Sequence, residues 1–174
     1  MTRVRQFFTD LAAPLLPLDE PMFSQYLTKA ENQLFRGLRR AEMRHSIRVA
    51  RLTLENLNAD LPQAERNAVV RAALLHDAGK IRYALGPVGK TIMVLFKGIL
   101  AKPGSRLART RAGDVYLNHP EYSWQLLQEL DSFPDHPYLY DLVRWHHEPE
   151  RFLERYKGSE RTVFLAFRQA DDAS

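Results

Sequence analysis

The 174-residue chain contains no cysteine, which excludes disulfide bonds, thiolate metal ligands and a cysteine nucleophile. It also lacks any uninterrupted apolar run of the roughly 18 residues that a membrane-spanning helix needs. Residues 1–19 carry scattered charges and two prolines in place of the compact apolar stretch of a secretory signal. From these absences we expect a cytoplasmic protein built as a single domain.

Acidic residues are absent from one long segment. Lys80 to Gly113 contains eight basic residues and no acidic ones, so the remainder of the chain is net negative although the whole carries +4. Residues 91–100 predict a short helix that is apolar on most sides. Three roles are open for this segment. It could be a core helix with a basic rim, a cap over a site for an anionic substrate, or a peripheral contact with an anionic membrane. The charge pattern indicates a local anionic partner and no specific nucleic-acid binding.

Hydrophobic periodicity predicts helices along most of the chain and no β-strand, so the expected fold is an all-α bundle of about six or seven helices. The expected helices span residues 20–36, 39–58, 63–77, 91–100, 118–130, 138–147 and 159 onward. We divide the chain into an N-terminal arm of residues 1–20 and a helical domain of residues 21–174. This domain carries the basic, apolar segment 81–113 as an insertion.

The helix predicted over 63–77 places a histidine on its buried side. Val69, Ala72, Ala73 and His76 are spaced at i, i+3, i+4 and i+7, which is one face of a helix. A buried imidazole needs a polar partner. Gly79 is expected to end the helix by adopting a positive φ.

Other polar residues are expected on the inner sides of their helices. His45 lies on the apolar stripe of its helix, and His146 completes a stripe that begins at Leu139. His119 precedes a proline and is expected at a helix N-terminus. Asp171 faces the apolar side of the last helix, where an unpaired carboxylate would be costly, whereas Asp172 points to solvent.

Each of these residues alone has an ordinary structural explanation. It is improbable, however, that all of them are simply buried polar groups whose hydrogen bonds are satisfied within the core. A shared metal centre would satisfy them at once. The candidate metal ligands are His45, His76, Asp77, His119, His146, His147 and Asp171. Ligands of these types favour one or two divalent transition-metal ions, Fe or Mn first and Ni, Co or Zn as alternatives.

The order of these residues resembles the HD superfamily of metal-dependent phosphohydrolases. That family's histidine, His-Asp pair and late aspartate are matched by His45, His76-Asp77 and Asp171. The run His76-Asp77-Ala78-Gly79-Lys80 is similar to the HDIG branch. His119-Pro120 and His146-His147-Glu148 resemble the two-metal members of the HD-GYP type. The Gly-Tyr-Pro signature of those members is absent, since Pro149-Glu150-Arg151 stands there, and this weakens a cyclic di-GMP assignment.

The resemblance implies a metal-dependent phosphohydrolase or phosphodiesterase acting on a nucleotide or a cyclic or linear dinucleotide. Asp77 would be shared by two metals, and a hydroxide bridging them would attack phosphorus. Asp77 and Lys80 are the candidate catalytic residues. The candidate substrate contacts are Lys80, Arg82, Lys90 and Arg144.

Two other functions stay open at this point. Some HD proteins with similar extra histidines are di-iron oxygenases that use O₂. The chain could also be a non-enzymatic module that binds a nucleotide or a membrane through the segment 81–113.

Overall fold

The computed structural model describes residues 17–82 and 110–174. Within these ranges the chain forms eight α-helices and one short 3₁₀-helix, with no β-strand, as the sequence predicted. The elements are α2 (Glu20–Ser24), α3 (Lys29–Arg36), α4 (Arg40–Asn56), α5 (Gln63–Leu75), η2 (Ala78–Arg82), α8 (Arg111–Glu129), α9 (Tyr138–Arg144), α10 (Pro149–Arg155) and α11 (Gly158–Asp172). None of them is long and apolar enough to cross a membrane.

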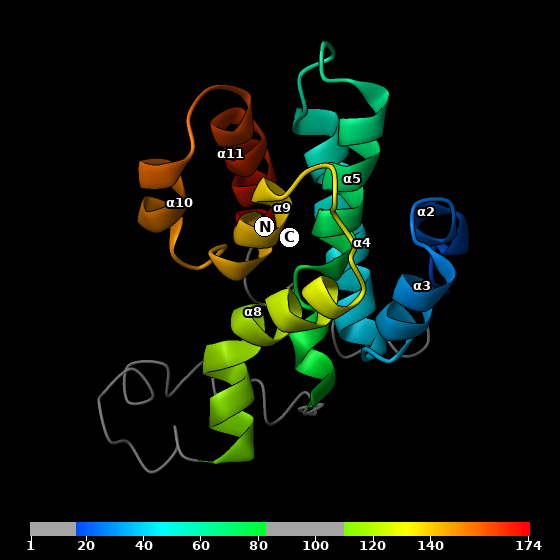
Figure 1. Ribbon diagram of the computed structural model, residues 1–174. Helices are drawn as coiled ribbons and strands as arrows, with labels where there is room; N and C mark the ends of the chain where they lie inside the picture. The colour runs from blue at the N-terminus through cyan, green and yellow to red at the C-terminus, as the bar shows by residue number, and fades with distance from the viewer. Residues whose placement is uncertain (1–16, 83–109) are drawn as a thin grey trace.

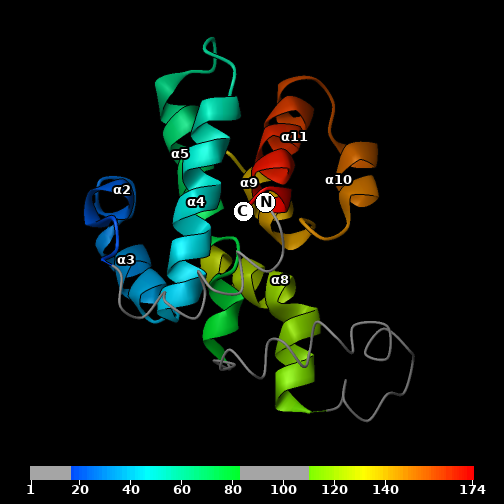
Figure 2. The same ribbon diagram turned by 180° about the vertical axis from the view of Figure 1, so that it is seen from behind.

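The helices α4 and α5 lie side by side at the centre of the bundle (Figure 1). On one side of this pair lie α2 and α3, and on the other lie α11 and then α10, as the reverse view also shows (Figure 2). The short η2 packs against α8, while α9 contacts both α5 and α8. This arrangement brings the C-terminal end of α5 close to α4, α8 and α11.

The buried face of α5 is the one that the sequence predicted. Val69, Ala72 and Ala73 are completely buried, and His76 is 1% exposed. The surrounding core is rich in phenylalanine, whose large rings contribute most of the apolar area removed from water. The phenylalanines that are nearly or completely buried are Phe23, Phe35, Phe133, Phe152, Phe164 and Phe167.

The single helix expected over 20–36 is wrong, because the chain forms two helices there. Thr28 is the N-cap of α3: its hydroxyl accepts a hydrogen bond from the Glu31 N–H, and the Glu31 carboxylate accepts one from the Thr28 N–H. This capping box satisfies two backbone donors at a helix start. The Thr-x-x-Glu pattern was present in the sequence and outweighs the continuous apolar periodicity.

Two other helix starts and one helix end also differ from expectation. The helix expected at 118 begins at Arg111, where the Thr110 hydroxyl caps it by accepting from the Gly113 N–H. The last helix, expected from residue 159, begins at Gly158, which has φ of 60°. The helix expected over 138–147 ends at Arg144. The expected helix 91–100 and residues 1–16 of the arm lie outside the described part of the chain.

A buried ion pair joins α3 to α5. The Glu31 side chain is 1% exposed, and its carboxylate accepts a hydrogen bond of 2.8 Å from the Arg71 guanidinium. Arg71 also donates to the carbonyl oxygen of Ser132 in the turn before α9. Burial alone would raise the pKa of Glu31, but the Thr28 N–H and Arg71 outweigh it and hold this pKa below 4.5.

We expect Glu31→Gln to lower the free energy of unfolding by about 2 kcal/mol, because it leaves the partly buried Arg71 guanidinium, 23% exposed, without its counter-ion. In a chain of this size that is a fall in Tm of about 4–8 °C. Because the folded-state pKa of Glu31 is lowered, its contribution is complete above the unfolded-state value. It is lost as the pH falls through the folded-state value. The Tm difference between parent and variant should therefore be largest near neutral pH and shrink below about pH 4.5, and a constant difference would contradict this account.

Candidate metal centre

The seven candidate metal ligands converge from separate elements of the fold. They are His45 in α4, His76 and Asp77 just after α5, His119 in α8, His146 and His147 after α9, and Asp171 in α11. The histidine rings form a connected cluster, with centroid separations from 4.1 Å between His146 and His147 to 5.5 Å between His119 and His146. Residues more than a hundred positions apart in sequence thus share one small volume.

One group of ligands lies where α4, α5 and α11 meet. The ligand atoms of His45, His76 and Asp171 lie within 4.8 Å of one another. Asp171 Oδ1 is 3.2 Å from His45 Nε2 and 3.8 Å from His76 Nε2. Asp172 points away from this group and pairs with Arg168 on the outer side of α11, as the helical spacing predicted. The group therefore offers two imidazoles and a carboxylate to one ion.

A second group contains three histidines. His119, His146 and His147 also have ligand atoms within 4.8 Å of one another, and the Nε2 atoms of His119 and His147 are 3.3 Å apart. Asp77 lies between the two groups. Its Oδ1 is 3.1 Å from His119 Nε2, and its Oδ2 is 3.6 Å from His76 Nε2. The two oxygens of this one carboxylate therefore face different groups.

Backbone carbonyl groups fix the protonation of three histidines. The Nδ1 atoms of His76, His119 and His146 lie 2.8, 2.9 and 2.7 Å from the carbonyl oxygens three residues earlier in the chain. A carbonyl oxygen only accepts, so each Nδ1 carries the proton and donates. In a neutral ring the Nε2 atom then has a free lone pair. The lone pairs of all three rings are therefore available to a metal, that of His76 in the first group and those of His119 and His146 in the second.

Two acceptor atoms of the cluster lack a hydrogen-bond donor. In the neutral tautomer His119 Nε2 is an acceptor, yet it faces the acceptor oxygen Asp77 Oδ1 at 3.1 Å. Asp77 Oδ1 and His146 Nε2 are both buried without a hydrogen-bond donor. Buried acceptors left in this way cost free energy, and a cation between them would remove that cost. The residues present therefore fit a divalent metal centre.

The protonation states of the histidines and of Asp77 also suit metal binding. Burial lowers the pKa of His45 and His119, lowers that of His146 well below its usual range, and brings that of His147 to about 4. Neutral imidazole is the form that binds metals. Burial would raise the pKa of Asp77, but Lys80 and His76 outweigh it and hold this pKa well below the usual value. Asp77 is therefore ionised.

A proline inside α8 explains the position of His119. The sequence placed His119 at a helix N-terminus, and this is wrong, since His119 lies in the middle of α8. Pro120 has no N–H, so it cannot donate to the carbonyl of Tyr116 four residues earlier. His119 Nδ1 donates to that carbonyl instead. The residue that looked like a helix start is thus the one that frees an acceptor to orient a candidate ligand.

Gly79 permits close packing next to the centre. The positive φ expected for Gly79 is wrong: among the described glycines, positive φ occurs at Gly158. A Cβ atom on Gly79 would lie 2.3 Å from the His119 carbonyl oxygen and 2.7 Å from the Ser123 nitrogen. The Gly79 N–H donates to Ser123 Oγ at 2.8 Å, and Ser123 Oγ donates to the His119 carbonyl at 2.9 Å. Sequence reasoning missed Ser123, although its i+4 spacing from His119 was visible.

The candidate substrate contacts differ in their surroundings. Lys80 Nζ lies 2.5 Å from Asp77 Oδ2, and its side chain is 28% exposed. Arg82 lies over the Tyr122 ring, with the guanidinium carbon 4.1 Å from the ring centroid. Arg144 makes two hydrogen bonds to the Glu121 carboxylate. Lys90 lies outside the described residues.

Comparison with known proteins agrees with this site. The family model for the HD domain matches residues 43–166, which is more than half of the chain. The match includes six of the seven candidate ligands and ends before Asp171. Searches of the curated proteins and of the solved structures returned no significant match. The chain belongs to the HD domain family and thus to the superfamily of metal-dependent phosphohydrolases.

Proposed function

We propose that this protein hydrolyses a phosphate ester through a centre of two divalent transition-metal ions. The observation that carries the proposal is the pair of buried acceptors without donors, Asp77 Oδ1 and His146 Nε2, at the junction of the two ligand groups. Hydrogen bonds within the described part of the chain do not satisfy them. Metal coordination would satisfy both, because each offers a lone pair.

The ligands divide between the two ions along the groups already described. His45, His76 and Asp171 would hold one ion, and His119, His146 and His147 the other, with Asp77 contributing one oxygen to each. Five imidazoles favour Fe or Mn over magnesium alone. When bound, such ions lower the pKa of water and stabilise negative charge on phosphoryl oxygens.

The chain's own residues would orient the substrate. Lys80 has an exposed fraction of 28% and lies against Asp77, so its ammonium can reach a phosphate oxygen at the edge of the centre. Arg82 follows on η2 and could contribute a second positive charge. The bidentate pair with Glu121 makes Arg144 a weaker choice, because two of its donors are already used.

We propose a nucleotide or a cyclic or linear dinucleotide as the substrate. The supporting observations are the family membership, the position of Lys80 against Asp77, and a second positive charge, Arg82, on the same short helix. His147 and part of Lys80 are exposed, so the centre is not sealed from solvent. A phosphorylated small molecule can therefore approach it without unfolding of the described helices.

The test is elemental analysis of protein purified without chelator or histidine tag, followed by hydrolysis assays. We expect close to two transition-metal ions per chain, the number that the two ligand groups would hold. We also expect hydrolysis of nucleotides or dinucleotides, followed by separation of their products, at equal rates with and without O₂. His146→Ala should lose both metal and activity. The matched control is His136→Ala, a histidine outside the cluster, which should lose neither. Metal-free protein that takes up no Mn²⁺ or Fe²⁺ would refute the proposal, and O₂-dependent turnover would indicate an oxygenase.

A further inference from the structure

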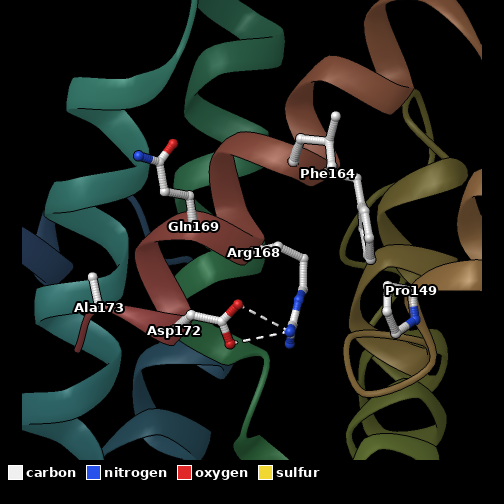
Figure 3. Close-up of a pocket in the computed structure, with 7 residues that line it drawn as sticks. Pro149, Phe164, Arg168, Gln169, Asp172 and Ala173 are labelled. Atoms are coloured by element: carbon white, nitrogen blue, oxygen red, sulfur yellow. Dashed lines mark hydrogen bonds and ion pairs between the residues drawn. The ribbon is translucent and has the colours of Figure 1, made fainter.

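We propose that Arg168 is a positioning residue that holds the two ligand groups in register with each other. This inference rests on the metal centre proposed above. Arg168 is on α11, one turn before Asp171, and its guanidinium bonds to the backbone of one ligand group and faces a carboxylate oxygen of the other. Figure 3 shows Arg168 joined to Asp172 and extending from α11 towards the segment that carries Pro149. These residues line a cleft of about 670 Å³.

The guanidinium of Arg168 links two segments that carry ligands. Its Nη1 donates a hydrogen bond of 2.8 Å to the backbone carbonyl of His146. That carbonyl lies beyond Arg144, the last residue of α9, and before the start of α10. The bond therefore ties the segment bearing His146 and His147 to α11.

The same nitrogen also faces a ligand of the other group. Arg168 Nη1 is 3.8 Å from Asp171 Oδ2, whereas Asp171 Oδ1 faces His45 Nε2 at 3.2 Å. One oxygen of this carboxylate is thus directed at the candidate ligands and the other at the guanidinium. Attraction between opposite charges at this distance favours that orientation of Asp171.

The hydrogen bond from Arg168 affects the metal centre because of where His146 lies. His146 is 1% exposed, its Nδ1 donates to Val143, and its ring is 5.2 Å from that of His76 in the other group. With its ring held by Val143 and its carbonyl held by Arg168, His146 has little freedom to move away from His76. Residues that orient ligands in this way usually change metal affinity by about 10–100-fold when replaced.

The test compares Arg168→Gln, Arg168→Lys and Asp172→Asn with the parent. Co²⁺ affinity is measured by competition with a chromophoric chelator, coordination by the visible absorption of bound Co²⁺, and folding by the Tm of the metal-free protein. We expect Arg168→Gln to bind Co²⁺ about 10–100-fold more weakly with an altered spectrum. Its metal-free Tm should stay close to that of the parent, since the side chain is partly exposed. Arg168→Lys, which keeps the positive charge, should recover part of the affinity.

Asp172→Asn is the matched control, because it removes the outer partner of Arg168 and leaves the bond to His146. Unchanged Co²⁺ binding in Arg168→Gln would overturn the proposal, as would an equal loss in Asp172→Asn. If Arg168→Gln does not fold, Arg168→Lys decides: weaker binding at a parent-like Tm supports the proposal, and parent-like binding overturns it. A parent that binds no Co²⁺ would instead refute the metal centre itself.

Discussion

Asp77→Asn is expected to remove most of the bound metal and to lower the rate of hydrolysis by at least about 10²–10³-fold. Asp77 is the residue whose two oxygens face both ligand groups, at 3.1 Å from His119 Nε2 and 3.6 Å from His76 Nε2. The amide keeps the shape of the side chain but carries no charge, and its NH₂ group cannot coordinate a cation. Both ions should therefore be affected by this one change.

Metal content and the melting temperature with and without added Mn²⁺ provide the measurements. The parent should be stabilised by metal, because an ion that binds the folded state shifts the unfolding equilibrium, and Asp77→Asn should lose most of this increase in Tm. Asp60→Asn, an exposed aspartate in the turn between α4 and α5, is the control and should behave as the parent does. An Asp77→Asn protein that still holds two ions would show that Asp77 is not a shared ligand.

Gly79→Ala should lower the free energy of unfolding by about 3 kcal/mol or more, corresponding to a fall in Tm of about 10 °C. The added Cβ would meet the His119 carbonyl oxygen at 2.3 Å and the Ser123 nitrogen at 2.7 Å. Both atoms belong to the backbone of α8, so neither can move unless the helix moves. Displacing α8 would also draw His119 away from Asp77, and metal affinity should fall together with stability.

Gly37→Ala provides a matched control for this prediction. A Cβ on Gly37 would also have a contact of 2.3 Å, but with Cδ1 of Ile81, the end of a flexible side chain that is 37% exposed. Its φ of −71° is open to alanine. We expect this variant to lose less than about 1 kcal/mol, because Ile81 can rotate away. Equal falls in Tm for the two variants would mean that close packing against α8 is not what requires glycine at position 79.

Local sequence patterns predicted much of the helical framework. The i, i+3, i+4, i+7 spacing that ends at His76 was correct, because a helix fixes which side chains share a face whatever packs against it. The same reasoning separated Asp171 from Asp172, and the structure turns the first towards His45 and the second towards Arg168. Where local signals competed, the prediction failed: the capping box at Thr28 divided a helix that periodicity had joined.

Pro120 shows why a local signal can mislead. A proline near a histidine suggested a helix start, since the first turn tolerates a residue without an N–H. In the folded protein the helix passes through Pro120, and the carbonyl that this proline leaves without its helical donor accepts from His119. Packing of α8 against η2 and α9 outweighs the local cost of the proline.

The sequence by itself determined the all-α class, the inward faces of the helices and the set of residues able to bind a metal, because these depend on spacing and on side-chain chemistry. Only the tertiary structure decided that Asp77 lies between two ligand groups, that Gly79 and Ser123 hold α8 against η2, and that Arg168 bonds to the carbonyl of His146. Contacts of this kind join residues from different helices. They arise from packing of the whole chain, which the periodicity of a single helix does not contain.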